Sequence, residues 1–100
     1  MQFNEHQIRL WRNMISVIED FRKGKIQYSD AVSRLAGTLD AGEFKNETLI
    51  RQWYDYWTPL EILNATKGDS TTIEDAGKYL LAMELFLNSQ ADFCNQEDEE

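Results

Sequence analysis

The chain is poor in the residues from which disulfides and metal sites are built, with one cysteine and one histidine among 100 residues, and it has a single proline. Cys94 alone cannot form an internal disulfide, which is typical of a protein in a reducing compartment. His6 has no cysteine or spaced carboxylate beside it to complete a ligand set, so we expect no metal site. The single proline and the scarcity of β-branched runs favour helices.

Long apolar runs are also missing from the sequence. No apolar stretch of about 18 residues occurs, and the N-terminal residues lack the basic and apolar regions of a secretory signal. We therefore expect a cytoplasmic protein that does not enter a membrane.

Positive charge is in short supply, because 18 acidic residues face 10 basic ones and the formal net charge is −8. Five of the excess negative charges lie near the C-terminus, at Asp92, Glu97, Asp98, Glu99 and Glu100. Binding to a phosphate backbone depends on lysine and arginine, so this balance argues against nucleic acid as a partner. The basic cluster at residues 22–25 is better explained as compensation of the negative end of a helix. An acidic surface suits a basic protein partner.

Motifs that carry catalysis are absent from the sequence. It contains no nucleotide-binding glycine loop, zinc-protease motif, EF-hand loop or nucleophile elbow. Neighbouring carboxylates such as Glu19 and Asp20 point in different directions on a helix and cannot converge on one substrate atom. We therefore expect no catalytic residue and no cofactor. The alternative to this expectation is an enzyme or ligand-binding domain whose site is assembled from residues that lie far apart in the sequence.

Apolar residues recur at helical spacing along most of the chain, and local signals divide them into five segments. The first segment, over residues 8–21, has a wide apolar face and is expected to stop at Gly24. The second is expected to begin with Ser29 as its N-cap and to end near Gly42.

Capping residues also delimit the remaining segments. Asn46 is expected to cap a third helix, and the Thr-Pro-Leu-Glu stretch at 58–61 resembles a capping box that breaks or kinks the chain and starts a fourth. The fourth helix is expected to end near Gly68. A second capping box, made by Thr71 and Glu74, then starts the last helix.

These segments predict an all-α protein, a compact bundle of four to five helices with the first and last helices central. Residues 1–91 form the single helical domain, and residues 92–100 form a disordered, flexible acidic tail. The residues expected to be buried are Trp11, Ile15, Ile18, Trp53, Trp57, Leu80 and Leu87.

The last helix has apolar residues nearly all the way round over residues 79–87. Leu81 and Leu85 leave its main apolar stripe and form a second face. Two interpretations follow: a central helix wrapped by the other four, or an interface with a partner or a second copy.

Glu84 falls inside the apolar face of the same helix. An unpaired buried carboxylate would be strongly unfavourable, so we expect either an arginine partner, with Arg51, Arg34 and Arg12 as candidates, or a position lining a groove near an interface.

The aromatic residues of the third segment share a face and are expected to be core, except Tyr54, which lies at the edge of that face and is expected to stay partly exposed. Tyr54 and Asp55 form a second candidate contact surface. The candidate protein-interface residues are Tyr54, Asp55, Leu81, Glu84 and Leu85.

One segment resembles a known family. Ile18, Phe21, Gly24, Lys25 and Ile26, followed by Ala31, Val32 and Leu35, are similar to the helix, Gly-Lys-Ile, helix opening of small bacterial immunity proteins of the colicin D immunity type. The resemblance covers residues 18–35. It implies a compact helical bundle that neutralises a basic toxin by presenting acidic groups to its active site, and it transfers no particular binding residue.

We therefore expect a non-enzymatic protein-binding module, of the immunity or antitoxin-like inhibitor kind, that binds a basic protein. The alternative is a homodimeric structural or assembly protein that uses the second apolar face of the last helix.

Overall fold

The computed structural model describes residues 3–98, and the side chains of residues 3–90. All regular structure in this part of the chain is helical, which confirms the all-α prediction. The elements are α1 (Glu5–Arg22), α2 (Tyr28–Ala41), α3 (Glu47–Lys67), the short 3₁₀ helix η1 (Gly68–Ser70) and α4 (Ile73–Asp98).

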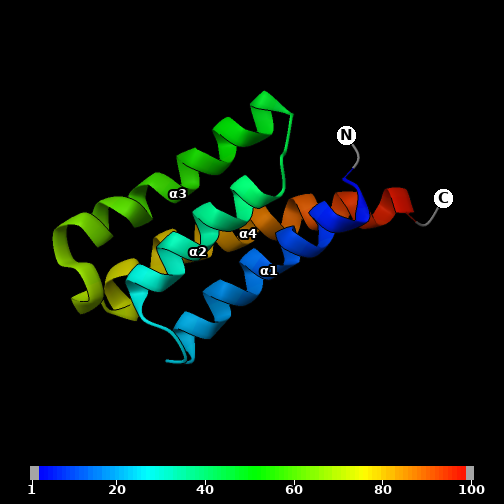
Figure 1. Ribbon diagram of the computed structural model, residues 1–100. Helices are drawn as coiled ribbons and strands as arrows, with labels where there is room; N and C mark the ends of the chain where they lie inside the picture. The colour runs from blue at the N-terminus through cyan, green and yellow to red at the C-terminus, as the bar shows by residue number, and fades with distance from the viewer. Residues whose placement is uncertain (1–2, 99–100) are drawn as a thin grey trace.

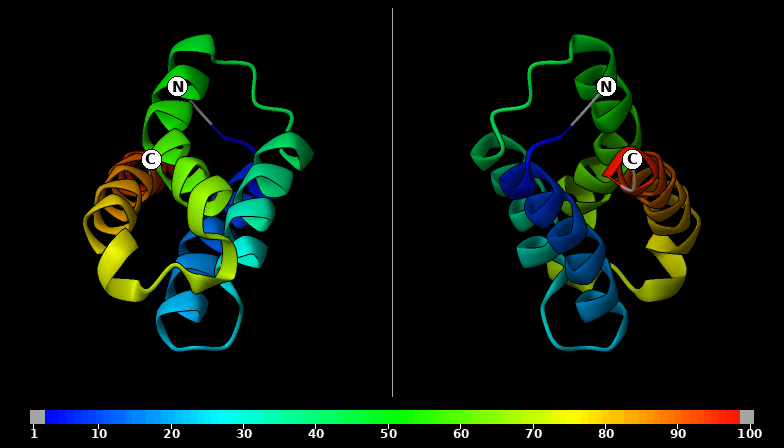
Figure 2. Two further views of the ribbon diagram at one scale, coloured as in Figure 1. Left: turned by 90° about the vertical axis from the view of Figure 1, so that its left-hand side faces the viewer. Right: turned by 90° about the vertical axis from the view of Figure 1, so that its right-hand side faces the viewer.

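The four α-helices form an up-and-down bundle, in which each helix runs antiparallel to the next (Figure 1). Each helix packs against its neighbour in the chain, and α4 closes the bundle by packing against α1. End-on views show α2 and α4 at opposite corners (Figure 2). The expectation that the first and last helices are central is therefore wrong, because every helix forms a corner and has one outward face.

The core lies along the axis between the four helices. Trp11 and Trp53 are almost completely buried, and their indole nitrogens have partners across the bundle. Nε1 of Trp11 donates a hydrogen bond of 2.8 Å to the carbonyl oxygen of Leu87, and Nε1 of Trp53 lies 3.3 Å from Sδ of Met14. Each indole thus buries its apolar body and still satisfies its one donor.

Most of the predicted core residues are buried. The confirmed ones are Trp11, Ile18, Trp53, Leu80 and Leu87. Ile15 and Trp57 are only partly buried, since they lie at the rim of the core and pack against it from outside. Nε1 of Trp57 donates a hydrogen bond of 3.2 Å to the carbonyl oxygen of Val32 and so ties α3 to α2.

The predicted stop of the first helix at Gly24 is confirmed. Gly24 has φ +75°, the left-handed conformation that glycine adopts without a Cβ penalty. The Gly24 N–H donates to the carbonyl of Phe21 at 3.0 Å, and the Lys25 N–H donates to that of Asp20 at 2.9 Å. These two bonds form a Schellman motif, which satisfies carbonyls that the helix end would leave open.

The expectation that Ser29 caps the second helix is wrong. The N-cap is Gln27, which makes no side-chain capping bond, and Ser29 lies within the first turn of α2. Its backbone N–H donates to Oδ1 of Asp69 at 2.9 Å, so a carboxylate from η1 caps α2 from across the fold. Hydrogen bonds from the side chain and then the backbone of Ser29 hold the pKa of Asp69 below its ordinary value.

The expected break at Thr58 is also wrong, because α3 continues through Pro59 to Lys67. A proline inside a helix removes one backbone hydrogen bond and usually bends or ends the helix. Here the buried residues Trp53 and Leu60 lie on one helical face on either side of the proline. A break would turn this face out of register with the core, so burial of these side chains outweighs the lost bond.

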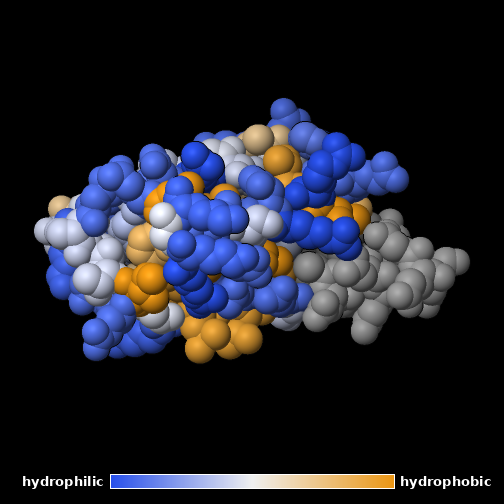
Figure 3. Space-filling view, turned by 90° about the horizontal axis from the view of Figure 1, so that it is seen from below, coloured by the Kyte–Doolittle hydropathy of each residue, from blue (hydrophilic) through white to orange (hydrophobic). Residues whose placement is uncertain are grey.

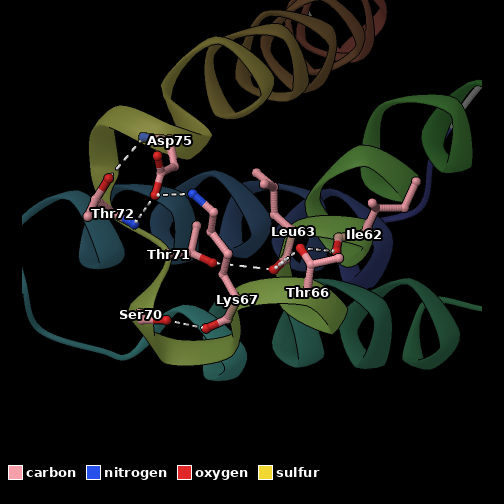
Figure 4. Close-up of polar contacts among 8 residues, drawn as sticks. All are labelled: Ile62, Leu63, Thr66, Lys67, Ser70, Thr71, Thr72 and Asp75. Carbon is pink, nitrogen blue, oxygen red and sulfur yellow. Dashed lines mark hydrogen bonds and ion pairs between the residues drawn. The ribbon is translucent and has the colours of Figure 1, made fainter.

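The last helix does begin with a capping box, but one residue later than expected. The pair is Thr72 and Asp75 instead of Thr71 and Glu74: the Asp75 N–H donates to Oγ1 of Thr72 at 3.0 Å, and the Thr72 N–H donates to Oδ2 of Asp75 at 3.2 Å (Figure 4). Thr71 is buried, and its hydroxyl points to the carbonyl of Leu63.

The acid of this capping box has a second partner. Nζ of Lys67 lies 3.2 Å from Oδ2 of Asp75, which joins the end of α3 to the start of α4. The Thr72 backbone and then the Lys67 ammonium lower the pKa of Asp75.

The predicted acidic tail at 92–100 overlaps the end of α4, whose backbone runs to Asp98. The side chains from residue 91 on, Cys94 among them, and residues 99–100 lie outside the described part of the chain. The flexibility of this segment stays a prediction.

Candidate protein-binding surfaces

The outward face of α4 carries exposed aliphatic side chains. Leu81 and Leu85 lie one helical turn apart, and their exposed fractions are 50% and 61%. Ile73, exposed by 47%, lies in the same i, i+4 row, and Gly77 lies between it and Leu81. We call Ile73, Gly77, Leu81 and Leu85 the α4 ridge. On the α4 side of the molecule, apolar surface protrudes from largely hydrophilic surroundings (Figure 3).

This exposure decides between the two interpretations of the last helix. A helix wrapped by the rest of the bundle would bury both leucines, so the central-helix interpretation is wrong. A role of the ridge as an interface stays a prediction.

Glu84 does have an arginine partner, but none of the three predicted ones. Nη1 of Arg22 lies 2.7 Å from Oε1 of Glu84, with side-chain exposures of 30% and 17%. The antiparallel packing of α1 on α4 brings the last residue of α1 to the middle of α4. Glu84 borders the α4 ridge because it lies directly before Leu85, and its ion pair with Arg22 of α1 supplies a counter-charge. The basic cluster at 22–25 thus contains a tertiary ion pair as well as a helix end.

Tyr54 lies on a different part of the bundle surface, on the side where α3 packs against α2. It is 40% exposed, as expected for the edge of the aromatic face. Its ring meets the rings of Trp53 and Trp57 edge-on, at centroid distances of 5.1 and 5.8 Å, and these contacts limit its orientation. Asp55 is exposed beside it.

Tyr54 lines a hollow of about 170 Å³. We call it the α2–α3 hollow. Its walls combine apolar and aromatic side chains with two carboxylates, and they are formed by Leu39, Asp40, Glu43, Phe44, Ile50 and Tyr54. Asp55 is not part of the wall. The five predicted interface residues are therefore not brought together: Leu81, Glu84 and Leu85 lie on α4, whereas Tyr54 and Asp55 lie on α3.

The electrostatics of this hollow are unusual for a helix end. The hollow lies at the C-terminal end of α2, where backbone carbonyls give a partial negative charge that basic residues normally offset. The last turn of α2 has no basic residue. Asp40 and Glu43 add two exposed carboxylates instead, and no side chain in the described part of the chain forms a hydrogen bond or ion pair with either.

The loop after α2 is anchored by aromatic packing. A Cβ at Gly42 would collide with the Phe44 ring, so any larger residue there would require this ring to move. The Phe44 ring in turn packs against Phe3 and Trp11, with centroid distances of 5.1 and 5.4 Å. Glu43 has φ +49°, which a non-glycine residue rarely adopts. The loop conformation thus depends on the core and sets where Glu43 stands.

Sequence reasoning missed the role of Asp40, Glu43 and Phe44 in shaping a surface. A signal was present, since acids with no accompanying base at a helix C-terminus reverse the usual preference. Which side chains gather around them depends on how α3 crosses α2, which local pattern does not reveal.

Two further observations concern sites of other kinds. Among residues 3–90, no group of three or more histidine, cysteine or acidic side chains is placed to hold a metal ion. No helix in the described part of the chain is long and apolar enough to cross a membrane.

Comparison with known proteins gives no relative from which a role could be transferred. No protein-family model, curated protein or solved structure matches the chain. The function has to be inferred from the surfaces themselves.

Proposed function

We propose that this chain is a non-enzymatic protein-binding module, and that its α4 ridge contacts a basic protein in the manner of an immunity or antitoxin-like inhibitor. The observation that carries the proposal is the pair Leu81 and Leu85, two adjacent leucines at least half exposed on one helix. Single exposed leucines are common on protein surfaces, whereas adjacent apolar side chains on one face are typical of contact sites.

Full burial of a leucine side chain is worth about 1.5 to 3 kcal/mol. Covering the exposed half of Leu81 and Leu85 therefore contributes roughly 1 kcal/mol from each residue, which suits the apolar centre of a larger contact.

The charge of the chain supports a basic partner. A net charge of −8 attracts a positively charged protein over several ångströms, speeds its encounter and disfavours acidic competitors. The resemblance of residues 18–35 to immunity proteins of the colicin D immunity type points in the same direction, towards a basic toxin.

A homodimer through the same ridge is the second candidate, and the position of Gly77 favours it. No heavy atom lies within 4 Å of a Cβ built at Gly77, so the ridge has a notch between Ile73 and Leu81. In an antiparallel pair, Leu81 of one copy can enter the notch at Gly77 of the other, and Leu85 then faces Ile73. Ridges of this i, i+4 kind interdigitate in the commonest class of helix packing.

The experiment that tests both candidates is the double substitution Leu81→Lys with Leu85→Lys. Because both side chains are exposed, we expect an unchanged helical circular-dichroism spectrum and melting temperature. A matched control, Gln52→Lys with Ile62→Lys, adds the same charge at exposed positions of α3. Affinity capture from cells that make the protein, with mass-spectrometric identification, reports the partner. Sedimentation reports self-association.

A basic protein captured by the wild type and the control, but not by the ridge variant, supports the first candidate. Self-association lost only in the ridge variant supports the homodimer. A folded ridge variant that keeps both its partner and its oligomeric state overturns the role of this surface.

A further inference from the structure

The α2–α3 hollow combines a small volume with apolar and aromatic side chains and two carboxylates. Its volume of about 170 Å³ is below the 300 to 1,000 Å³ of most small-molecule sites, so it suits one side chain better than a metabolite. Its walls are polar and apolar in about equal parts, because two carboxylates lie among the apolar and aromatic side chains.

We propose that this hollow binds an arginine or lysine side chain of the partner protein. The inference rests on the proposed function, because it assumes a protein partner, and it deepens it by naming the group that the partner inserts. Asp40 and Glu43 would accept hydrogen bonds from the cationic head. The face of Tyr54 would contact the cation, and Leu39 and Ile50 would pack against the methylene groups.

Charge complementarity is the reason for choosing a cation over an apolar or acidic side chain. The end of α2 already has a partial negative charge, and Asp40 and Glu43 increase it without any basic side chain in the last turn to offset it. A guanidinium or ammonium group brings the charge that this helix end lacks. A carboxylate would be repelled, and an apolar side chain would desolvate both acids without replacing their hydrogen bonds.

The aromatic wall adds to this preference. The Tyr54 ring packs edge-on against those of Trp53 and Trp57, and these contacts restrict its orientation in the free protein. Cations bind the faces of aromatic rings, and arginine does so more often than lysine. A ring whose orientation is already restricted in the free protein loses less entropy on binding.

The test is an NMR titration of the full ¹⁵N-labelled chain with a blocked Gly-Gly-Arg-Gly-Gly peptide. The reference peptide has citrulline in place of arginine, which keeps the shape and removes the charge. We expect saturable shifts of backbone amides in the 39–54 segment with the arginine peptide, and binding about fivefold weaker or more with citrulline.

The double substitution Asp40→Asn with Glu43→Gln should weaken binding of the arginine peptide by about fivefold or more, because two charge contacts are lost. The melting temperature of this double variant should equal or exceed that of the wild type, because the substitutions remove two acids from the negative end of a helix. Glu19→Gln with Asp30→Asn is the matched control: it removes the same charge from exposed positions elsewhere and should leave binding unchanged. Tyr54→Phe should retain binding, and Tyr54→Leu should weaken it.

The proposal is overturned if the citrulline peptide binds equally well, if the control pair weakens binding as much as the hollow pair, or if the shifts spread over all acidic surfaces. These outcomes are separable from failure of the proposed function, which is measured on the α4 ridge at another corner of the bundle. A ridge variant that keeps its partner while the arginine peptide still binds the hollow would remove the ridge and leave the hollow as the contact site.

Discussion

Arg22 and Glu84 join the C-terminal end of α1 to the middle of α4 through a contact of 2.7 Å between Nη1 and Oε1. The two residues are 62 positions apart in sequence, and the pair lies beside the α4 ridge. It holds the helix that presents Leu81 and Leu85 at a defined position against the rest of the bundle.

We predict that Arg22→Met lowers the free energy of unfolding by about 1 to 3 kcal/mol, because it leaves the mostly buried carboxylate of Glu84 without a partner. A double-mutant cycle with Glu84→Gln, measured by urea denaturation, should give a coupling energy of about 1 kcal/mol. Additive effects of the two single substitutions would contradict a stabilising pair.

Trp53 and Trp57 stack on each other with ring centroids 5.6 Å apart, yet they should differ in their contribution to stability. We predict that Trp53→Ala, at a fully buried site, lowers the unfolding free energy by about 3 to 5 kcal/mol. Trp57→Ala should lower it by about 2 kcal/mol, since this side chain is only partly buried. Denaturant unfolding of both variants checks the order, and a larger loss at Trp57 would refute it.

Tyr28 should make the protein sensitive to alkaline pH. Burial, and then the charge of Glu61, raises the pKa of Tyr28 to about 12, and its hydroxyl donates a hydrogen bond of 2.7 Å to the carbonyl of Leu60. The unfolded chain ionises this tyrosine near pH 10, so the stabilisation is complete below pH 10 and is lost as the pH rises towards 12. The expected decrease is about 2 to 3 kcal/mol, as each pKa unit is worth about 1.4 kcal/mol.

The check is the unfolding free energy of the wild type and of Tyr28→Phe between pH 9 and 12. Phenylalanine has no hydroxyl to ionise, so the variant should lack this part of the pH dependence. Parallel pH profiles for the two proteins would show that Tyr28 is not its source.

Asp69 should make α2 sensitive to acid. Its pKa is lowered by hydrogen bonds from Ser29, so its contribution is present above the unfolded pKa of about 4 and is lost as the pH falls below it. We predict that Asp69→Ala melts below the wild type at neutral pH and that the difference shrinks on acidification. Ser29→Ala keeps the backbone donor and should have a smaller effect. A difference in melting temperature that does not change between pH 7 and pH 3 would contradict this.

Local signals in the sequence were sufficient wherever the determining interactions lie within a few residues. Gly24 ends α1 because only glycine adopts φ +75° easily, and Asn46 caps α3 through a bond of 2.9 Å from the N–H of Leu49 to its side chain. The helical spacing of apolar residues likewise predicted the burial of Trp11 and Trp53. The same spacing was wrong for Tyr56, which was expected in the core and is exposed almost as much as Tyr54. The net acidity is also a property of the sequence alone.

Tertiary packing decided the features that depend on contacts between distant segments. Pro59 lies inside a continuous α3 because the core holds the residues before and after it on one face. Asp69 caps α2 from 40 residues away. Arg22, assigned locally to a helix end, pairs with Glu84 because α1 and α4 are antiparallel neighbours. The choice of which face of α4 points outward, and hence the exposure of Leu81 and Leu85, follows from the number of helices available to cover it. A repeating apolar pattern shows that a helix has a face to bury, but only the packed bundle determines which faces find neighbours.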